Sequence, residues 1–248
     1  MSFDKEVSII IPAKNEEAYL PKTLDSLKRQ KGLSKMEIIV SVSPETTDKT
    51  ALIAERYRCK VVEGGRPATA RNSGANKASY ETLFFLDADT YPENDYFLSK
   101  ALSEFNSRNL DVAGTFLFPD FVGNGFKKSI YNMIFSIENR VFLKRQKTKK
   151  PKMQSGMFFK KDAITALNGF KEGIFGEDSE IAERAVNHNP PFNFGILESC
   201  GPLITSVRRY EREGIINVLL KVLYLNAKAE IFGYDSLVGV YDNFYKLS

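Results

Sequence analysis

Histidine and cysteine are scarce in this chain of 248 residues, and tryptophan is absent. The single histidine, His188, stands near the end of a predicted helix, where a cap is expected rather than a Ser-His-Asp triad or a histidine metal site. Cys59 and Cys200 lie far apart and form no Cys-x-x-Cys spacing. The sequence therefore predicts no disulfide framework and favours a reducing, cytoplasmic compartment.

Long hydrophobic runs are also missing. The most apolar stretch, residues 215–225, is interrupted by Asn217 and Lys221, whereas a membrane-crossing helix needs roughly 20 apolar residues. Residues 7–11 are too few for a signal-peptide core, and Pro12 follows them. No membrane span or signal peptide is expected. The glycine patterns of P-loop and dinucleotide-binding proteins are absent as well.

Positive charge is concentrated in one segment. The net charge is +4, but residues 144–152 hold six basic residues and no acid, which leaves −2 for the rest of the chain. Such a protein is not expected to bind nucleic acid in general. Its 43% hydrophobic and 27% charged residues are typical of a globular protein.

Strands and helices alternate along the first ninety residues. The predicted strands cover residues 7–11, 37–43, 61–62 and 82–86. The predicted helices are one capped by Asn15 and two over residues 46–58 and 68–78. This order predicts an α/β fold, with βαβ units on a mainly parallel sheet that helices flank.

The second part of the chain alternates less regularly. Pro92 is expected in the first turn of a helix that continues to about residue 106. The basic tract, residues 144–152, is expected to be a mobile loop. The remaining predicted elements are strands at 111–118, 157–159, 192–197 and 202–207, and helices at 126–143, 162–167, 177–187 and 211–231.

Two carboxylates follow the fourth predicted strand in Asp87-Ala88-Asp89. Residues two apart in extended chain project to the same side, so both carboxylates converge. They lie at the carboxyl end of a parallel strand, where open α/β sheets bind ligands. This arrangement suits Mg²⁺ or Mn²⁺ shared with a diphosphate. The alternative is a pair of solvated loop acids.

A second acidic pair, Glu177-Asp178, opens a predicted helix after a glycine-containing loop. One of them could be a general base that takes a proton from a hydroxyl group. Acids in a first helical turn also complement the helix dipole without any further role.

Three arginines are candidates for binding phosphate. Arg71 lies among small residues that permit a nucleotide to approach closely, although a surface arginine is an equal alternative. Arg208 and Arg209 follow the last predicted strand, where they could stabilise a departing diphosphate or simply be solvated.

Five motifs, in their order along the chain, resemble those of the family 2 glycosyltransferases of the GT-A fold. They are VSIIIPAKNEE at residues 7–17, Glu37-Ile38-Ile39-Val40, Ala70-Arg71-Asn72-x-Gly74, Phe85-Leu86-Asp87-Ala88-Asp89-Thr90, and Asn168-Gly169-Phe170 with Gly176-Glu177-Asp178. The resemblance covers about residues 6–210.

The resemblance implies roles for individual residues. Asp89 would ligate the metal, and Asp87 would assist it or hold the ribose. Asp178 would be the general base, and Glu177 a neighbouring acid that contacts acceptor or donor. The residues implied to line the nucleotide-sugar pocket are Pro12, Asn15, Glu16, Arg71, Asp87 and Ala88.

Two departures from the family pattern stand out. The acidic run that often follows the second strand is replaced here by residues 41–48, in which Ser43 or Glu45 could contact the base instead. The histidine that many members place after the last core strand as a metal ligand is also missing.

The resemblance implies an inverting transferase that moves a sugar from a UDP- or GDP-linked donor to the hydroxyl of a lipid-linked saccharide or polysaccharide precursor, with Mn²⁺ or Mg²⁺. It implies a GT-A domain over residues 1–210, with a nucleotide half (1–110) and an acceptor half (111–210). Residues 211–248 would be a helical extension that contacts a membrane surface or another subunit. The alternatives are a non-catalytic nucleotide-sugar-binding or scaffold protein and a sugar-phosphate nucleotidyltransferase.

Contact with an anionic membrane is a further expectation. The amphipathic helix before the basic tract is rich in aromatic residues, and together they could dock on the inner face of the cell membrane. A solvated lysine loop is the equal alternative.

Overall fold

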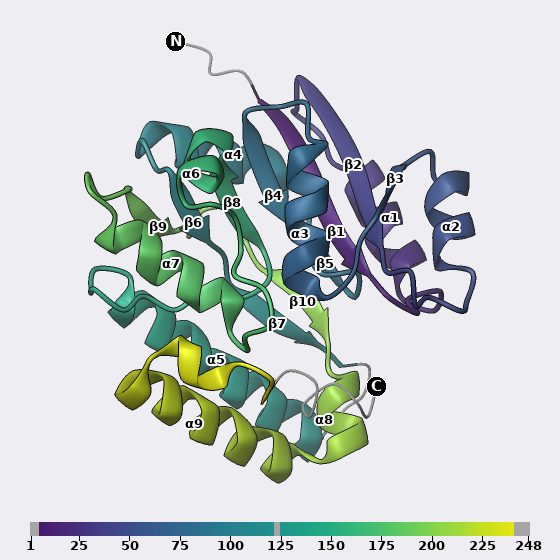
Figure 1. Ribbon diagram of the computed structural model, residues 1–248. Coiled ribbons are helices and arrows are strands. Elements are labelled where there is room, and N and C mark those ends of the chain that lie inside the picture. The colour runs from purple at the N-terminus through teal and green to yellow at the C-terminus, as the bar shows by residue number, and fades with distance from the viewer. Residues whose placement is uncertain (1–4, 122–124, 241–248) are drawn as a thin grey trace.

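The computed structural model describes residues 5–121 and 125–240. Its centre is a seven-stranded sheet in the order β3-β2-β1-β4-β8-β6-β9 (Figure 1). The strands are β1 (Glu6–Ala13), β2 (Lys35–Val42), β3 (Lys60–Glu63), β4 (Thr82–Phe85), β6 (Val112–Gly114), β8 (Met157–Lys160) and β9 (Phe194–Ile196). The first four are mutually parallel, and β8 pairs antiparallel with β4 and β6. The predicted parallel βαβ half is confirmed.

Helices cover both faces of this sheet, because its central strands are apolar on both sides. Val7 and Ile9–Ile11 of β1 are all fully buried. On one face, Phe84 and Phe158 pack with α1 (Leu20–Lys28) and α4 (Phe97–Ser107). On the other face, Phe85 and Phe159 pack with α3 (Pro67–Asn76), α6 (Lys161–Ala166) and α7 (Glu177–Asn187). Helix α2 (Thr50–Arg56) lies between β2 and β3 in the chain.

Helix α3 lies unusually close to the sheet. A Cβ atom added at Gly74 would lie 2.4 Å from Ile10 Cγ2 and 2.9 Å from Ser41 Oγ. The small residues of this helix therefore allow Arg71, on the preceding turn, to reach the sheet edge.

A second sheet and the C-terminal helices complete the fold. The sheet has the order β5-β10-β7 and consists of β5 (Thr90–Pro92), β7 (Leu117–Asp120) and β10 (Leu203–Ser206). The helices are α5 (Phe126–Arg145), α8 (Arg208–Glu213), α9 (Ile215–Phe232) and the 3-10 turn η1 (Tyr234–Leu237). Helices α5 and α9 lie together at one end of the molecule, below the sheets in Figure 1.

Several local predictions were wrong. Pro92 ends strand β5 rather than opening a helix, and α4 begins at Phe97. Asn15 adopts a φ of 55° and accepts a bond from Thr47 N, so it does not cap α1, which begins at Leu20. Residues 111–118 form two strands in different sheets, and the final helix is broken at Gly214, whose φ is 84°.

The basic tract is not a free loop. Its first two residues belong to α5, and Lys152 is 7% exposed. Glu230 of α9 pairs with Arg145 at 2.7 Å, Lys152 at 3.6 Å and Lys150 at 3.7 Å. The tract was mispredicted because its acidic partner lies about eighty residues further along the chain.

Candidate active site

The Asp87-Ala88-Asp89 segment connects β4 to β5, at the carboxyl edge of the parallel strands. The loops that follow β1 and β2 end at the same edge, where Thr47 N donates to Asn15 Oδ1 at 2.9 Å. Thr23 of α1 donates a buried hydrogen bond to Ala88 O at 2.8 Å. The fold therefore brings together the carboxylate segment and the turns that were predicted to hold a nucleotide.

Arg71 joins the two acidic pairs. Its side chain is buried, with Nη2 3.0 Å from Asp87 Oδ1 and Nη1 2.7 Å from Glu177 Oε1. Asp87 and Glu177 are ninety residues apart in the chain, so one guanidinium from α3 fixes the distance between the segments that carry them. A two-pronged arginine bridge of this kind holds carboxylates with more geometric precision than a lysine could.

The loop before α7 is attached to the same helix. Asn72 donates from Nδ2 to Phe170 O at 2.9 Å and accepts from Phe170 N at 2.8 Å. Gly169 has a φ of 71°, and a Cβ atom there would lie 2.5 Å from Asn72 Oδ1. The Asn168-Gly169-Phe170 motif is thus required for this close approach, which places Glu177 and Asp178 beside Arg71.

Asp178 lies in the first turn of α7, where its Oδ1 accepts a bond from Ser179 N at 2.7 Å. Burial raises the pKa of the Asp178 carboxyl, the negative charge of Glu177 raises it further, and Arg71 partly opposes both. A carboxylate with a raised pKa is a stronger base than a solvated one, which is the property that a general base needs.

Arg208 holds the other end of the site. Its Nη1 and Nη2 lie 2.8 Å and 2.6 Å from the two Glu16 carboxylate oxygens, and its Nε lies 3.2 Å from Asp89 Oδ2. The guanidinium also lies over the Tyr19 ring, 4.5 Å from its centroid. Burial raises the pKa of Asp89 to about 7, while Arg208 acts to lower it.

The remaining predicted residues lie on the β1–β2 side or in α8. Ser43 is buried, and its Oγ accepts from Glu45 N at 3.3 Å. Glu45 is exposed and pairs with Lys14. Pro12 lies opposite Ser41 in the β1–β2 register. Arg209 Nε lies 3.5 Å from Glu213 Oε1. The part that each of these plays in a donor site stays a prediction.

Ser155 and Tyr234 are neighbours of the site that the sequence did not reveal. Ser155 Oγ accepts a bond from Asp87 N at 2.9 Å. Gly156, whose φ is 87°, follows it, and a Cβ atom there would lie 2.2 Å from Thr115 Oγ1. Tyr234 lies against Gly176, and its OH accepts from Lys152 Nζ at 2.9 Å. For Ser155, the glycine that follows it in the sequence was a local signal.

The donor atoms present fit a divalent cation that takes other ligands from its substrate. Asp87 and Asp89 offer hard carboxylate oxygens, and 41% of the Asp87 side chain is exposed. Within residues 5–121 and 125–240, no three His, Cys, Asp or Glu side chains are grouped closely enough to hold a metal by themselves. Mg²⁺ is usually held by one or two carboxylates with phosphates and water. A cation bound here would share the Asp89 carboxylate with Arg208, or it would displace Arg208 from that carboxylate.

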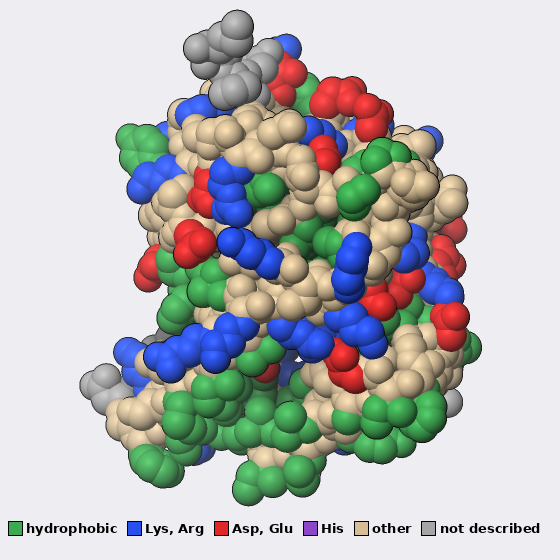
Figure 2. Space-filling model, turned by 90° about the vertical axis from the view of Figure 1, so that its left-hand side faces the viewer, with side chains coloured by type: hydrophobic (Ala, Val, Ile, Leu, Met, Phe, Trp, Pro, Cys, Tyr) green, Lys and Arg blue, Asp and Glu red, His purple; other side chains and the backbone are tan. Residues whose placement is uncertain are grey.

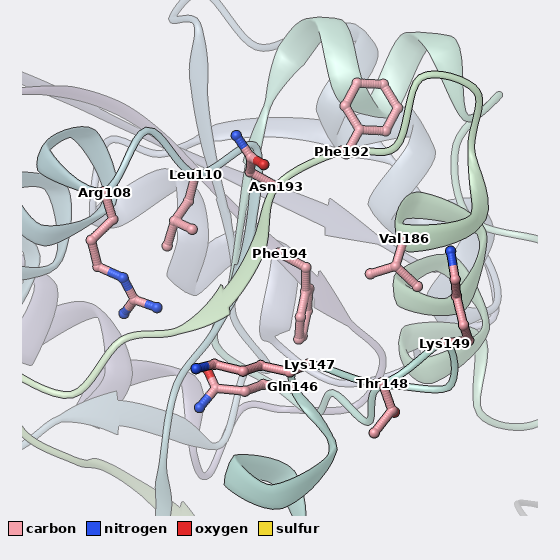
Figure 3. Close-up of a pocket in the computed structure, with 10 residues that line it drawn as sticks. All are labelled: Arg108, Leu110, Gln146, Lys147, Thr148, Lys149, Val186, Phe192, Asn193 and Phe194. Atoms are coloured by element: carbon pink, nitrogen blue, oxygen red, sulfur yellow. The ribbon is translucent and has the colours of Figure 1, made fainter.

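A pocket of about 630 Å³ lies elsewhere, beside β9 (Figure 3). Figure 3 shows Phe194 between Arg108 on one side and Val186 on the other. Its ten lining residues include none of the predicted catalytic, donor-binding or metal-binding residues. The carboxylate site is therefore a different part of the surface.

Residues 8–164 match the model of the glycosyl transferase family 2. The chain belongs to this family. The glycosyltransferase GlyA of Streptococcus pneumoniae is 27% identical to it over 204 residues, which cover 74% of this chain and 28% of GlyA.

Solved structures of glycosyltransferases share the fold. The mannosyltransferase PcManGT of Pyrobaculum calidifontis, in complex with GDP-Man and Mn²⁺, has a TM-score of 0.64 at 20% identity over 88% of this chain and 64% of its own. Residues 1–349 of TarS from Staphylococcus aureus, in complex with UDP-GlcNAc, have a TM-score of 0.61 at 20% identity. The match covers 81% of this chain and 58% of the TarS chain. The predicted GT-A fold is confirmed. This family 2 glycosyltransferase spans less than two thirds of each of these three relatives.

Proposed function

We propose that this family 2 chain transfers a sugar from a UDP- or GDP-linked donor to an acceptor hydroxyl, with inversion at the anomeric carbon. The observation that carries the proposal is the Arg71 bridge, which couples a carboxylate of the Asp87–Asp89 segment to Glu177, next to Asp178. Groups that would bind a diphosphate and accept a proton would thereby belong to one site.

On the donor side, Asp89 and Asp87 would hold Mn²⁺ or Mg²⁺. When bound, the ion would stabilise the negative charge of the departing diphosphate. Arg208 would add a second positive charge there, since it already lies beside Asp89. The other proposed donor contacts are Pro12, Asn15, Glu16, Ser43, Glu45, Arg71, Ala88 and Arg209.

On the acceptor side, Asp178 would act as general base. It would take the proton of the acceptor hydroxyl while that oxygen forms its bond to the anomeric carbon and the bond to the diphosphate oxygen breaks. Glu177 would keep Arg71, and through it Asp87, in register with Asp178. A single displacement of this kind inverts the anomeric configuration.

Residues 1–210 would form the transferase domain, with a nucleotide half over 1–110 and an acceptor half over 111–210. Residues 211–248 would form an extension. We propose a lipid-linked saccharide or polysaccharide precursor as acceptor and a cytoplasmic location with contact to the inner face of the membrane. The basic tract supports this because Lys144, Lys147 and Lys149 are exposed.

Calorimetric titration with UDP and with GDP, each with and without Mn²⁺, tests the donor site. One nucleotide is expected to bind tightly only with Mn²⁺, and Asp89→Ala is expected to abolish that binding. Asp162→Ala, an exposed acid in α6, is the control and should bind as the wild type does. Binding of neither nucleotide with any metal would overturn the proposal and favour a scaffold protein.

Asp178→Asn separates a transferase from a protein that only binds nucleotide sugars. It is expected to keep nucleotide binding and to lose transfer by at least about a hundredfold, the usual contribution of a general base. Transfer that survives in this variant would exclude Asp178 as the base.

A further inference from the structure

Helix α9 has two apolar faces, of which the fold uses one. Val218, Leu225 and Ala229 are buried against the rest of the chain. The other face exposes a stripe of large apolar side chains, each 61–73% accessible: Ile216, Leu220, Leu223, Tyr224 and Ile231. These positions recur at intervals of three, four and seven residues, so they share one side of the helix. Packing among residues 5–121 and 125–240 does not explain this stripe.

Helix α5 carries a second exposed stripe. Met133, Ile137 and Val141 follow one another at intervals of four residues and are 56%, 54% and 42% exposed. The two helices lie at the same end of the molecule (Figure 1), and Arg145 of α5 pairs with Glu230 of α9 at 2.7 Å. Figure 2 shows hydrophobic side chains gathered along this end. We call this surface, formed by the two stripes, the α5–α9 face.

Positive charge borders the α5–α9 face. Residues 126–152 and 215–232 together contain eleven basic and two acidic residues, a net charge of +9 that leaves −5 for the rest of the chain. Of the two acids, Glu230 is engaged by Arg145 and Lys152. In Figure 2 a row of lysine and arginine side chains lies directly above the apolar band. The exposed basic residues here are Lys127, Lys128, Arg140, Lys144, Lys147 and Lys149.

We propose that the α5–α9 face docks on an anionic lipid bilayer, with α9 lying in the plane of the interface. A helix with exposed apolar side chains and basic neighbours binds such a surface through apolar burial and attraction to acidic headgroups. Tyr224 suits the headgroup region, where an apolar ring and a polar hydroxyl are both satisfied. Within the described residues, no helix is long and apolar enough to cross a bilayer.

The charge distribution favours lipid over a second copy of the chain. Two such faces brought together would place their positive borders next to each other, which disfavours a symmetric dimer. Nucleic acid would match the charge but would leave the apolar stripes exposed to water. Of these three occupants, an anionic bilayer is the one that satisfies both features.

The α5–α9 face is connected to the candidate active site at both ends of α9. Arg208, beside Asp89, begins the helix α8 that leads into α9. Just after α9, Tyr234 lies against Gly176 and accepts a bond from Lys152. Docking would therefore hold the site next to the bilayer surface, where a lipid-linked acceptor would be presented. The inference rests on the membrane contact in the proposed function and deepens it by naming the face that makes the contact.

Cosedimentation of the full chain with vesicles tests the proposal. Strong binding is expected to vesicles of phosphatidylcholine with phosphatidylglycerol, and weak binding to vesicles of phosphatidylcholine alone. Binding to the anionic vesicles should fall as the salt concentration is raised. Leu220→Asp with Leu223→Asp should remove most of the binding, because both side chains are exposed and would carry charge into the interface. Lys144→Ala, Lys147→Ala and Lys149→Ala together should weaken it on the order of a hundredfold.

Two matched variants control for general effects of charge and polarity. Leu52→Asp changes an exposed leucine in α2, and Lys49→Ala with Lys77→Ala and Lys100→Ala removes three exposed lysines remote from α5 and α9 in the sequence. Both should bind vesicles as the wild type does. Equal binding to both vesicle types, no binding at all, or a dimer that Leu220→Asp with Leu223→Asp dissociates would overturn the proposal. UDP and GDP calorimetry on the same variants reports the donor site separately, so loss of one property is distinguishable from loss of the other.

Discussion

Arg208 Nε lies 3.2 Å from Asp89 Oδ2, and the rest of the same guanidinium is bonded to Glu16. These residues come from three distant parts of the chain and meet at the carboxyl edge of the sheet. A positive side chain thus stands beside Asp89, which the sequence predicted to bind a metal. Two cations of different kinds, a guanidinium and a metal ion, would share this carboxylate.

Arg208→Ala is therefore expected to strengthen Mn²⁺ binding in the absence of nucleotide. Removal of the guanidinium frees Asp89 and Glu16, and the gain should be on the order of tenfold, as for a typical coupling between two sites. Titration of the protein with Mn²⁺, followed by electron paramagnetic resonance of the free ion, measures it. The same variant should bind the UDP or GDP complex of Mn²⁺ more weakly, because a diphosphate-stabilising charge is lost.

Arg212→Ala is the matched control, since Arg212 lies in the same helix and 46% of its side chain is exposed. It should leave Mn²⁺ affinity unchanged. Arg208→Lys, which keeps the charge, should remain closer to the wild type than Arg208→Ala does. Unchanged or weaker Mn²⁺ binding by Arg208→Ala would show that this arginine does not compete for Asp89.

Arg71→Ala is expected to destabilise the protein by about 3–5 kcal/mol, the usual cost of removing one partner of a buried ion pair. The variant leaves Glu177, only 11% of whose side chain is exposed, without its positive partner. Urea unfolding at pH 8 measures the change. Arg29→Ala, which removes an arginine with 59% exposure and a 3.6 Å contact to Asp95, should change stability by less than about 1 kcal/mol. Equal small effects of both changes would mean that Arg71 does not hold the site together.

The sequence predicted those elements whose cause is local. The mostly β-branched run of residues 7–11 predicted β1, and the alternation of strands and helices predicted the parallel half of the sheet. The carboxyl edge of that sheet then predicted where Asp87 and Asp89 would lie. In contrast, Pro92 has the same local preference in a first helical turn as at the end of a strand, and its pairing with Leu203 decided the outcome.

The contacts that assemble the site could not be predicted in this way. Arg71 meets Glu177 across 106 positions, and Arg208 meets Glu16 across 192. No periodicity or spacing encodes such pairs, because they depend on how distant elements pack. For the same reason the basic tract looked like a solvated loop until Glu230 of α9 was seen to anchor it.

Glu138 provides a test of stability against pH. Burial alone raises the pKa of its carboxyl from 4.5 to about 7. The folded state therefore holds this proton more tightly than the unfolded state, and the group destabilises the fold increasingly as pH rises from 4.5 to 7. Glu138→Gln removes that loss, so it should be more stable than the wild type at pH 8, by about 2–3 kcal/mol, and nearly equal to it at pH 4.

Glu104→Gln should show the opposite sign. Hydrogen bonds from Ser199 and an ion pair with Arg108 lower the pKa of Glu104 despite its partial burial. Its ionised form stabilises the fold above pH 4.5, and that contribution disappears as pH falls through the lowered pKa. Urea unfolding of both variants at pH 4 and pH 8 measures the two effects. If Glu138→Gln is no more stable than the wild type at pH 8, its carboxyl is solvated.

The pH dependence of transfer tests the acceptor side of the site. A general base must be ionised, so kcat/KM should fall about tenfold per unit as pH drops below the raised pKa of Asp178. Glu177→Gln removes the negative charge that helps to raise this pKa and leaves Arg71 to lower it, so the acidic limb should move to lower pH. Glu172→Gln, an exposed acid in the preceding loop, should leave the limb in place. A limb that stays fixed in Glu177→Gln would assign the titration to another group, because Asp178 cannot lose an adjacent charge without a change in its pKa.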